Sequence, residues 1–178
     1  MKYHPVESQV PPNSRAAKLL EGASYYDAWS ITSGNVGLSA LEHFIAAAKR
    51  TPKWIDVCMA ARNRVGRLVG LKDLGALSAV LADKPASAYK SGERVGIFTV
   101  FENSFDEAIV GDKDTHLNVA LSIYREAHSD GQHVTVTVTT IVHVKNLLGQ
   151  IYMLPVKPMH RLIAPTVLSA IGDTENAA

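Results

Sequence analysis

The chain has 178 residues and a mass of 19.2 kDa, a length typical of a single domain. With 47% apolar and 20% charged residues it can bury a sizeable core, which excludes a disordered or fibrous chain. The formal charge of +1 makes nucleic acid a poor partner, and no apolar run approaches the roughly 18 residues that cross a bilayer.

The first part of the chain predicts an arm, a short helix and a strand. Residues 1–12 contain three prolines and little periodicity, so we expect an extended arm. A short helix is expected to run to Leu20, with the side chains of Asn13 and Ser14 as its caps. A strand follows at Ser24–Ile31, because its residues alternate between two faces. One of these faces carries Tyr25, Asp27, Trp29 and Ile31.

Two helices are predicted next. From Leu38 to Arg50 the apolar residues recur every three or four positions, the period of an amphipathic helix. Thr51 and Pro52 predict the start of the second helix, because threonine can cap and proline is tolerated in the first turn. We expect this helix to end near Gly70. Its apolar stripe consists of Trp54, Ile55, Cys58, Ala61, Val65, Leu68 and Val69.

The remainder of the chain is dominated by predicted strands. Residues 71–92 are compatible with either helical turns or a loop, because glycine and proline interrupt the helical pattern of apolar residues. Four consecutive strands are then expected, each of the longer ones with one buried face. Tyr152 lies in a segment that leads through Pro155 and Pro158 into a last helix containing Leu162 and Ile171. The predicted strands are Glu93–Glu102, Glu107–Gly111, His116–Ala127 and Gln132–Lys145.

This order of elements predicts an α+β, helix-grip fold. A twisted antiparallel sheet with one apolar face needs a cover, and the C-terminal helix is the late element that can supply it. A cystatin-like fold is the alternative, and the early strand disfavours it. We expect an arm and short helix at residues 1–22, one helix-grip domain at residues 23–172 and a loose tail at residues 173–178.

Six segments resemble one uncharacterised bacterial family, a domain of unknown function in the Bet v 1-like superfamily, also termed START-like or polyketide-cyclase-like. The resemblance covers about residues 20–170 and implies a curved antiparallel sheet around a C-terminal helix. The matching segments are Tyr25-Tyr26-Asp27-Ala28-Trp29, Thr51-Pro52-Lys53-Trp54, Arg62-Asn63-Arg64 with Gly70-Leu71-Lys72, residues 92–98, residues 111–117 and Pro158-Met159-His160-Arg161.

The resemblance also implies a range of functions. Helix-grip relatives usually hold a hydrophobic or amphipathic small molecule between the sheet and the C-terminal helix, and some catalyse cyclisation or hydrolysis there. Members of the family occur alone or fused behind a Rossmann domain similar to short-chain dehydrogenases. No Gly-x-Gly-x-x-Gly follows the first predicted strand here, so a nicotinamide role would need a separate partner.

Three polar residues are candidates to bind the polar end of a ligand. Arg62 interrupts an otherwise apolar helical stripe, where its guanidinium either binds a polar group in a cavity or reaches back to water. His160 is in phase with the apolar residues of the last helix, as a ligand donor or as a satisfied core histidine. Tyr152 can offer a hydroxyl to the same cavity, and Trp54 and Phe98 can form its apolar walls.

Asp114 and His116 form an Asp-x-His pair at the entry to a strand. A carboxylate beside an imidazole raises its basicity, which suits general acid-base catalysis. His116 falls on the polar face of its strand, however, and Asp114 can simply cap a turn. The candidate catalytic residues are therefore His116, Asp114 and His160.

Neither a metal nor a cofactor is expected. The seven histidines show no paired ligand spacing, and the lone Cys58 lies on an apolar stripe where an inert thiol is the usual case. The single cysteine and the absence of an apolar signal in residues 1–5 predict a cytoplasmic protein.

The sequence is compatible with three functions. The first is binding of a small hydrophobic or amphipathic molecule between the sheet and the last helix. The second is an enzyme of cyclase or hydrolase type in the same cavity. The third is an interaction module that forms a homodimer or docks a Rossmann-type oxidoreductase.

Overall fold

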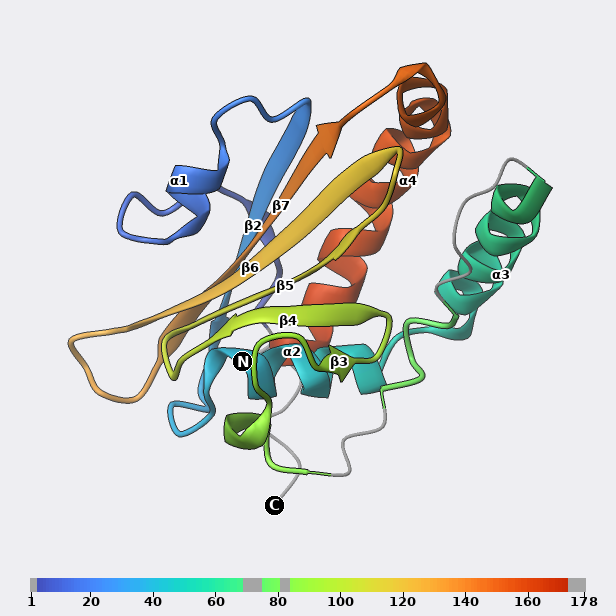
Figure 1. Cartoon of the computed structure of the whole chain (residues 1–178). Coiled ribbons are helices and arrows are strands. Elements are labelled where there is room, and N and C mark those ends of the chain that lie inside the picture. The colour runs from blue at the N-terminus through green and yellow to red at the C-terminus, as the bar shows by residue number, and fades with distance from the viewer. Residues whose placement is uncertain (1–2, 69–74, 81–83, 173–178) are drawn as a thin grey trace.

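The computed structural model, which describes residues 3–68, 75–80 and 84–172, is an α+β fold (Figure 1). A curved antiparallel sheet has the strand order β1-β2-β7-β6-β5-β4-β3, and the longest helices lie on one side of it. The elements are β1 (Val6–Glu7), α1 (Ala16–Leu19), β2 (Tyr25–Ser33), α2 (Ala40–Lys49), α3 (Lys53–Leu68), the 3-10 turn η1 (Ala86–Ala88), β3 (Arg94–Val95), β4 (Phe98–Asn103), β5 (Glu107–Lys113), β6 (Leu117–Ala127), β7 (Val134–Val144) and α4 (Leu147–Gly172).

The period-two alternation of the long strands sets the two faces of the sheet. In β6 and β7 the apolar residues pair with each other across the strands, as Ile123 does with Val138. These side chains point toward the helices, where Val134 and Val136 are fully buried. The predicted helix-grip layout is confirmed, because α4 packs against β2 and α2 along this face.

The opposite face of the sheet is partly covered as well, contrary to the prediction of a single buried face. The segment around α1 lies across it and buries Ala16 against the sheet. Ile141 and Thr139 on this face are fully buried although they alternate with the core residues. The predicted N-terminal arm also forms β1, which pairs with the outer edge of β2.

Two helix starts differ from the sequence expectation. The N-cap of α1 is Arg15, because the Ser14 hydroxyl donates to the Pro11 carbonyl instead of capping the helix. Ser39 caps α2 in a capping box with Glu42, which the apolar periodicity did not reveal. The hydroxyl of Thr51 is buried without a partner among the described residues, so it does not cap α3.

The last helix begins earlier than predicted. It starts at Leu147 and continues through Pro155, Pro158 and Pro165. A proline inside a helix removes one backbone hydrogen bond and leaves a carbonyl unpaired. Pro155 and Pro158 are exposed, so water can reach those carbonyls and the helix persists.

The strand predicted before the first hairpin also differs from the structure. The predicted strand Glu93–Glu102 is divided into β3 and β4 at a turn where Gly96 has a positive φ of 59°. The predicted helix end at Gly70 and the tail at residues 173–178 lie outside the described residues. Within the described part of the chain, no helix is long and apolar enough to cross a membrane.

Candidate functional site

The helix-facing side of the sheet is only partly covered at its centre. Val119 and Leu121 on β6, Val138 on β7 and Phe98 on β4 all face the helices, yet each stays partly exposed. We call these four residues the half-covered strip. The strip is therefore apolar surface that the helices do not cover completely.

Arg62 and Tyr152 come together beside this strip from two different helices. The Nε atom of Arg62 on α3 donates to the Tyr152 hydroxyl on α4 at 2.9 Å. The guanidinium also lies 5.3 Å from the centre of the Tyr152 ring, a cation-π contact. Tyr152 and Val119 pack against the same group of buried residues. The pair therefore places a cation and a hydroxyl at one end of the strip.

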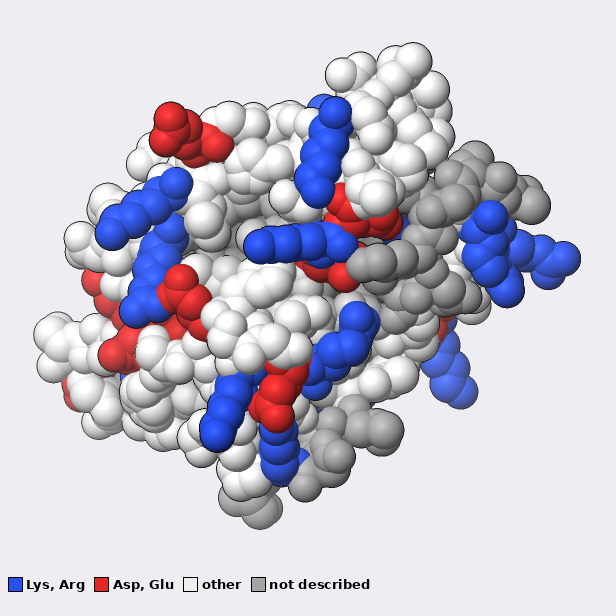
Figure 2. Space-filling model, in the orientation of Figure 1, with Lys and Arg blue, Asp and Glu red and all other residues white. Residues whose placement is uncertain are grey.

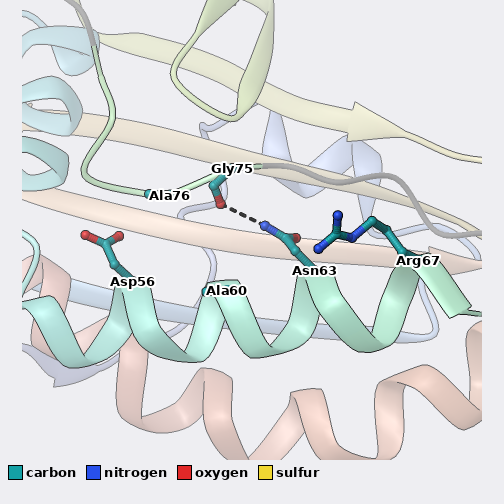
Figure 3. Close-up of a pocket in the computed structure, with 6 residues that line it drawn as sticks. All are labelled: Asp56, Ala60, Asn63, Arg67, Gly75 and Ala76. Atoms are coloured by element: carbon teal, nitrogen blue, oxygen red, sulfur yellow. Dashed lines mark hydrogen bonds between the residues drawn. The ribbon is translucent and has the colours of Figure 1, made fainter.

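Asn63 connects this pair to a pocket on another side of α3. Arg62 donates to the Asn63 side-chain oxygen at 2.9 Å, and the Asn63 amide donates to the Gly75 carbonyl at 3.1 Å. Figure 3 shows Asn63 between α3 and the segment at Gly75. The pocket has a volume of about 270 Å³ and is lined by Asp56, Ala60, Asn63, Arg67, Gly75 and Ala76.

A second pocket, of about 440 Å³, lies on the other side of the sheet. The N-terminal segment at residues 7–10 and the start of β2 form its walls. Its lining residues are Glu7, Ser8, Gln9, Val10, Leu20, Tyr26, Asp27 and Ala28. Neither of these two pockets lies between the sheet and α4, where the sequence analysis expected the ligand.

His160 on α4 joins a polar cluster on β2 and β7. Its Nε2 atom lies 3.2 Å from Asp27 Oδ1 and 3.1 Å from the Thr140 hydroxyl. Tyr25 donates its hydroxyl to the other Asp27 oxygen at 2.7 Å, and its ring meets the His160 ring edge-on. The prediction that His160 points toward the sheet is confirmed.

The electrostatics of this cluster favour an ionised aspartate. Burial by itself would raise the pKa of Asp27, but the hydrogen bonds from His160 and Tyr25 and the charge of the imidazole outweigh it and lower that pKa. Burial, together with the bond to Asp27, raises the pKa of Tyr25. An ionised carboxylate only accepts hydrogen bonds, so the Nε2 atom of His160 donates to Asp27.

The Asp114–His116 pair takes other partners. Asp114 Oδ1 accepts hydrogen bonds from the backbone and hydroxyl of Thr115 in the turn between β5 and β6. His116 Nδ1 faces the Asn146 side chain at the start of α4. The contacts between Asp114 and Thr115 agree with the turn-capping interpretation of Asp114.

The two predicted aromatic walls are separated. Phe98 lies in the half-covered strip and meets the Phe44 ring edge-on, with 5.9 Å between ring centres. Trp54 is exposed on α3 and is not among the side chains that pack against the described core clusters. Its stripe was assigned from periodicity alone, and the residues of α3 that pack inward are Ile55 and Met59. Cys58 is a free, half-buried thiol.

Asp27, Tyr25 and Thr140 were not selected as site residues from the sequence. The signal was limited to the alternation that placed Tyr25 and Asp27 on one face of a strand. The contact between Asp27 and His160 joins residues 133 positions apart, so local periodicity could not reveal it. No group of three metal-binding side chains occurs among residues 3–68, 75–80 and 84–172.

Comparison with known proteins establishes the family. A family model described as a protein of unknown function, DUF2867, matches residues 19–167. The chain belongs to the DUF2867 family. The match spans β2 through most of α4, so it includes the strip, the Arg62–Tyr152 pair and His160. No curated protein and no solved structure matches the chain.

Proposed function

We propose that this member of the DUF2867 family binds a small amphipathic molecule along the half-covered strip. The apolar part of the ligand contacts Phe98, Val119 and Leu121, and its polar end meets Arg62 and Tyr152. The observation that carries the proposal is the Arg62–Tyr152 pair, because two helices bring a cation and a hydroxyl to the end of a partly exposed apolar surface. Ligand sites typically combine an apolar lining with a few convergent polar groups.

The chemistry of Arg62 favours a ligand with a carboxylate or another planar anionic end. A guanidinium presents a fork of donors that can bind two oxygens at once. The Tyr152 hydroxyl, which accepts from Arg62 Nε, can donate its own hydrogen to the same ligand. This proposal includes two further points. The chain is a helix-grip ligand binder of the Bet v 1-like superfamily, and it acts in a reducing compartment such as the cytoplasm.

The test is a titration of the purified protein with dansyl-undecanoic acid, a fluorescent fatty acid. We expect Arg62→Gln to weaken binding about tenfold or more, because the charge-assisted hydrogen bonds of the guanidinium are lost. Tyr152→Phe should weaken it by a smaller factor. Arg64→Gln is the matched control, since Arg64 is exposed on the same helix. Equal affinity of the wild type, Arg62→Gln and Tyr152→Phe would rule out the assigned polar end.

Acid-base catalysis at His160 is the second candidate function, and the Asp27–His160 contact favours it. Asp27 orients the imidazole through Nε2, which leaves Nδ1 as the proton acceptor. Mass spectrometry of compounds that co-purify with the protein identifies the substrate to use. Conversion of that compound by the wild type and not by His160→Gln would show catalysis, whereas stable retention by both would leave binding alone.

A further inference from the structure

Two helices present apolar side chains to solvent on the side that faces away from the sheet. Seven large apolar residues are between 42% and 72% exposed. We call them the outer helical face. They are Trp54, Val57 and Val65 on α3, and Leu147, Ile151, Leu154 and Leu162 on α4. Single exposed apolar residues are ordinary on protein surfaces, whereas a group of seven on two helices is typical of an interaction site.

The helical period explains why these residues form one surface. On α4 the members recur at spacings of three, four and eight residues and lie roughly opposite the buried Met153. On α3 they lie on a different side from Ile55 and Met59, which pack inward. The hydrogen bond from Arg62 to Tyr152 joins the two helices, and Figure 3 shows a second helix running beside α3. The exposure of the seven residues places both apolar stripes on the solvent side of these helices.

The charge around the outer helical face is positive. Helix α3 carries three exposed cations, Lys53, Arg64 and Arg67, against one aspartate, Asp56, whose carboxylate is bonded to Ser78. Helix α4 contains exposed Lys157 and Arg161 and no acidic residue in its sequence. Figure 2 shows lysine and arginine side chains projecting at the α3 side of the molecule.

We propose that the outer helical face docks on an anionic lipid bilayer. Apolar side chains that include a tryptophan, flanked by cations on helices lying parallel to the surface, are the features of an interfacial membrane-binding helix. A second copy of the chain is disfavoured, because pairing two such faces would bring cations against cations. A partner helix usually needs a groove, and the exposed residues here project outward from two helices.

This docking surface does not depend on the proposed ligand site. The seven residues lie on the solvent side of α3 and α4, whereas the half-covered strip lies between those helices and the sheet. Docking also differs from spanning the bilayer, since only one side of each helix is apolar and exposed. A separate experiment therefore tests the docking proposal.

The experiment is co-sedimentation of the full chain with lipid vesicles. Vesicles with about one third phosphatidylglycerol are compared with pure phosphatidylcholine. We expect binding to the anionic vesicles that weakens about tenfold when the salt concentration is raised tenfold. Ile151→Gln with Leu154→Gln should lower the partition coefficient about tenfold or more. Lys53→Gln with Arg64→Gln should lower it on anionic vesicles only.

Matched controls use exposed residues elsewhere on the molecule. Val6→Gln with Leu19→Gln controls for loss of apolar surface, and Lys18→Gln with Lys90→Gln controls for loss of charge. Circular dichroism verifies that each variant folds. Absence of vesicle binding by the wild type would overturn the proposal, as would equal losses in the test and control variants. A dimer in light scattering that Ile151→Gln with Leu154→Gln dissolves would also overturn it, in favour of a second copy.

Discussion

His43 is a histidine buried in the protein core. Only 1% of it is exposed, and its Nε2 atom has no hydrogen-bond partner among the described residues. Burial, assisted by the positive charge of Arg125 and opposed by Glu42 and the backbone of Asn35, lowers its pKa from 6.5 to about 4. A proton on this ring would place an uncompensated charge in the core, so the native state holds the neutral form.

The depressed pKa of His43 predicts acid sensitivity. The unfolded chain takes up a proton at this residue below pH 6.5, whereas the native state does not until about pH 4. The stabilisation is therefore complete above pH 6.5 and is lost as the pH falls toward 4, by about 3 kcal/mol in the free energy of unfolding. Urea unfolding measured at intervals from pH 7 to pH 4.5 tests this.

His43→Gln is the informative comparison for the pH effect. The variant removes the titrating group, so its stability should change less with pH over this window even if it is less stable throughout. The slope against pH, and not the stability at any one pH, is the quantity to compare. Parallel curves for the wild type and His43→Gln would contradict the assignment to this residue.

At the scale of single elements, the start of α2 depends on a capping box. Ser39 accepts a hydrogen bond from the Glu42 backbone N–H, and the Glu42 carboxylate accepts one from the Ser39 backbone at 2.7 Å. These bonds satisfy two of the free amide groups at a helix start. Helix α2 contributes Leu41, Phe44 and Ile45 to the core, so its position affects the whole helix layer.

Substitution of the cap tests this account of α2. Ser39→Ala should lower the free energy of unfolding by about 1 kcal/mol, because the side-chain acceptor is lost. Ser39→Asp keeps an acceptor and should cost less. Denaturant unfolding at neutral pH measures both. A greater loss for Ser39→Asp than for Ser39→Ala would show that space around the residue, and not the cap, governs the effect.

At the scale of the whole molecule, Glu107 attaches the N-terminal segment to the sheet. Only 7% of this residue is exposed, and its two carboxylate oxygens accept from the Arg15 backbone at 2.9 and 3.0 Å. The Ser122 hydroxyl donates to the same carboxylate at 2.7 Å. The bonds connect α1 with β5 and β6, which are far away in the sequence.

Removal of this carboxylate should loosen the N-terminal segment. Glu107→Ala leaves the Arg15 amide and the Ser122 hydroxyl without their acceptor, and we expect a loss of about 2 to 3 kcal/mol in the free energy of unfolding. Hydrogen exchange at the Arg15 amide should accelerate more than exchange in β7. Glu126→Ala is the control, since Glu126 is exposed on β6. Equal losses in both variants would contradict the role of Glu107.

The strands and the helix-grip layout could be predicted because the alternation in β6 and β7 is a local property. Successive side chains of a strand point to opposite faces, so the apolar set in Val134–Val144 identifies the core face without knowledge of its partner strand. The rule that proline breaks a helix failed in α4, because water can solvate the carbonyls that the prolines leave unpaired. Pro155 and Pro158 predicted a break, but they lie on the exposed side of α4, where their unpaired carbonyls stay solvated.

The sequence by itself therefore determined the fold class, the strand faces and the direction in which His160 points. Only the tertiary structure decided that Arg62 meets Tyr152, that His160 meets Asp27 and that Trp54 belongs to an outer surface. The physical reason is the range of the interactions. Backbone geometry repeats over two to four residues and is visible in any short segment, whereas side chains that are distant in sequence become neighbours only when the sheet and helices close on one another.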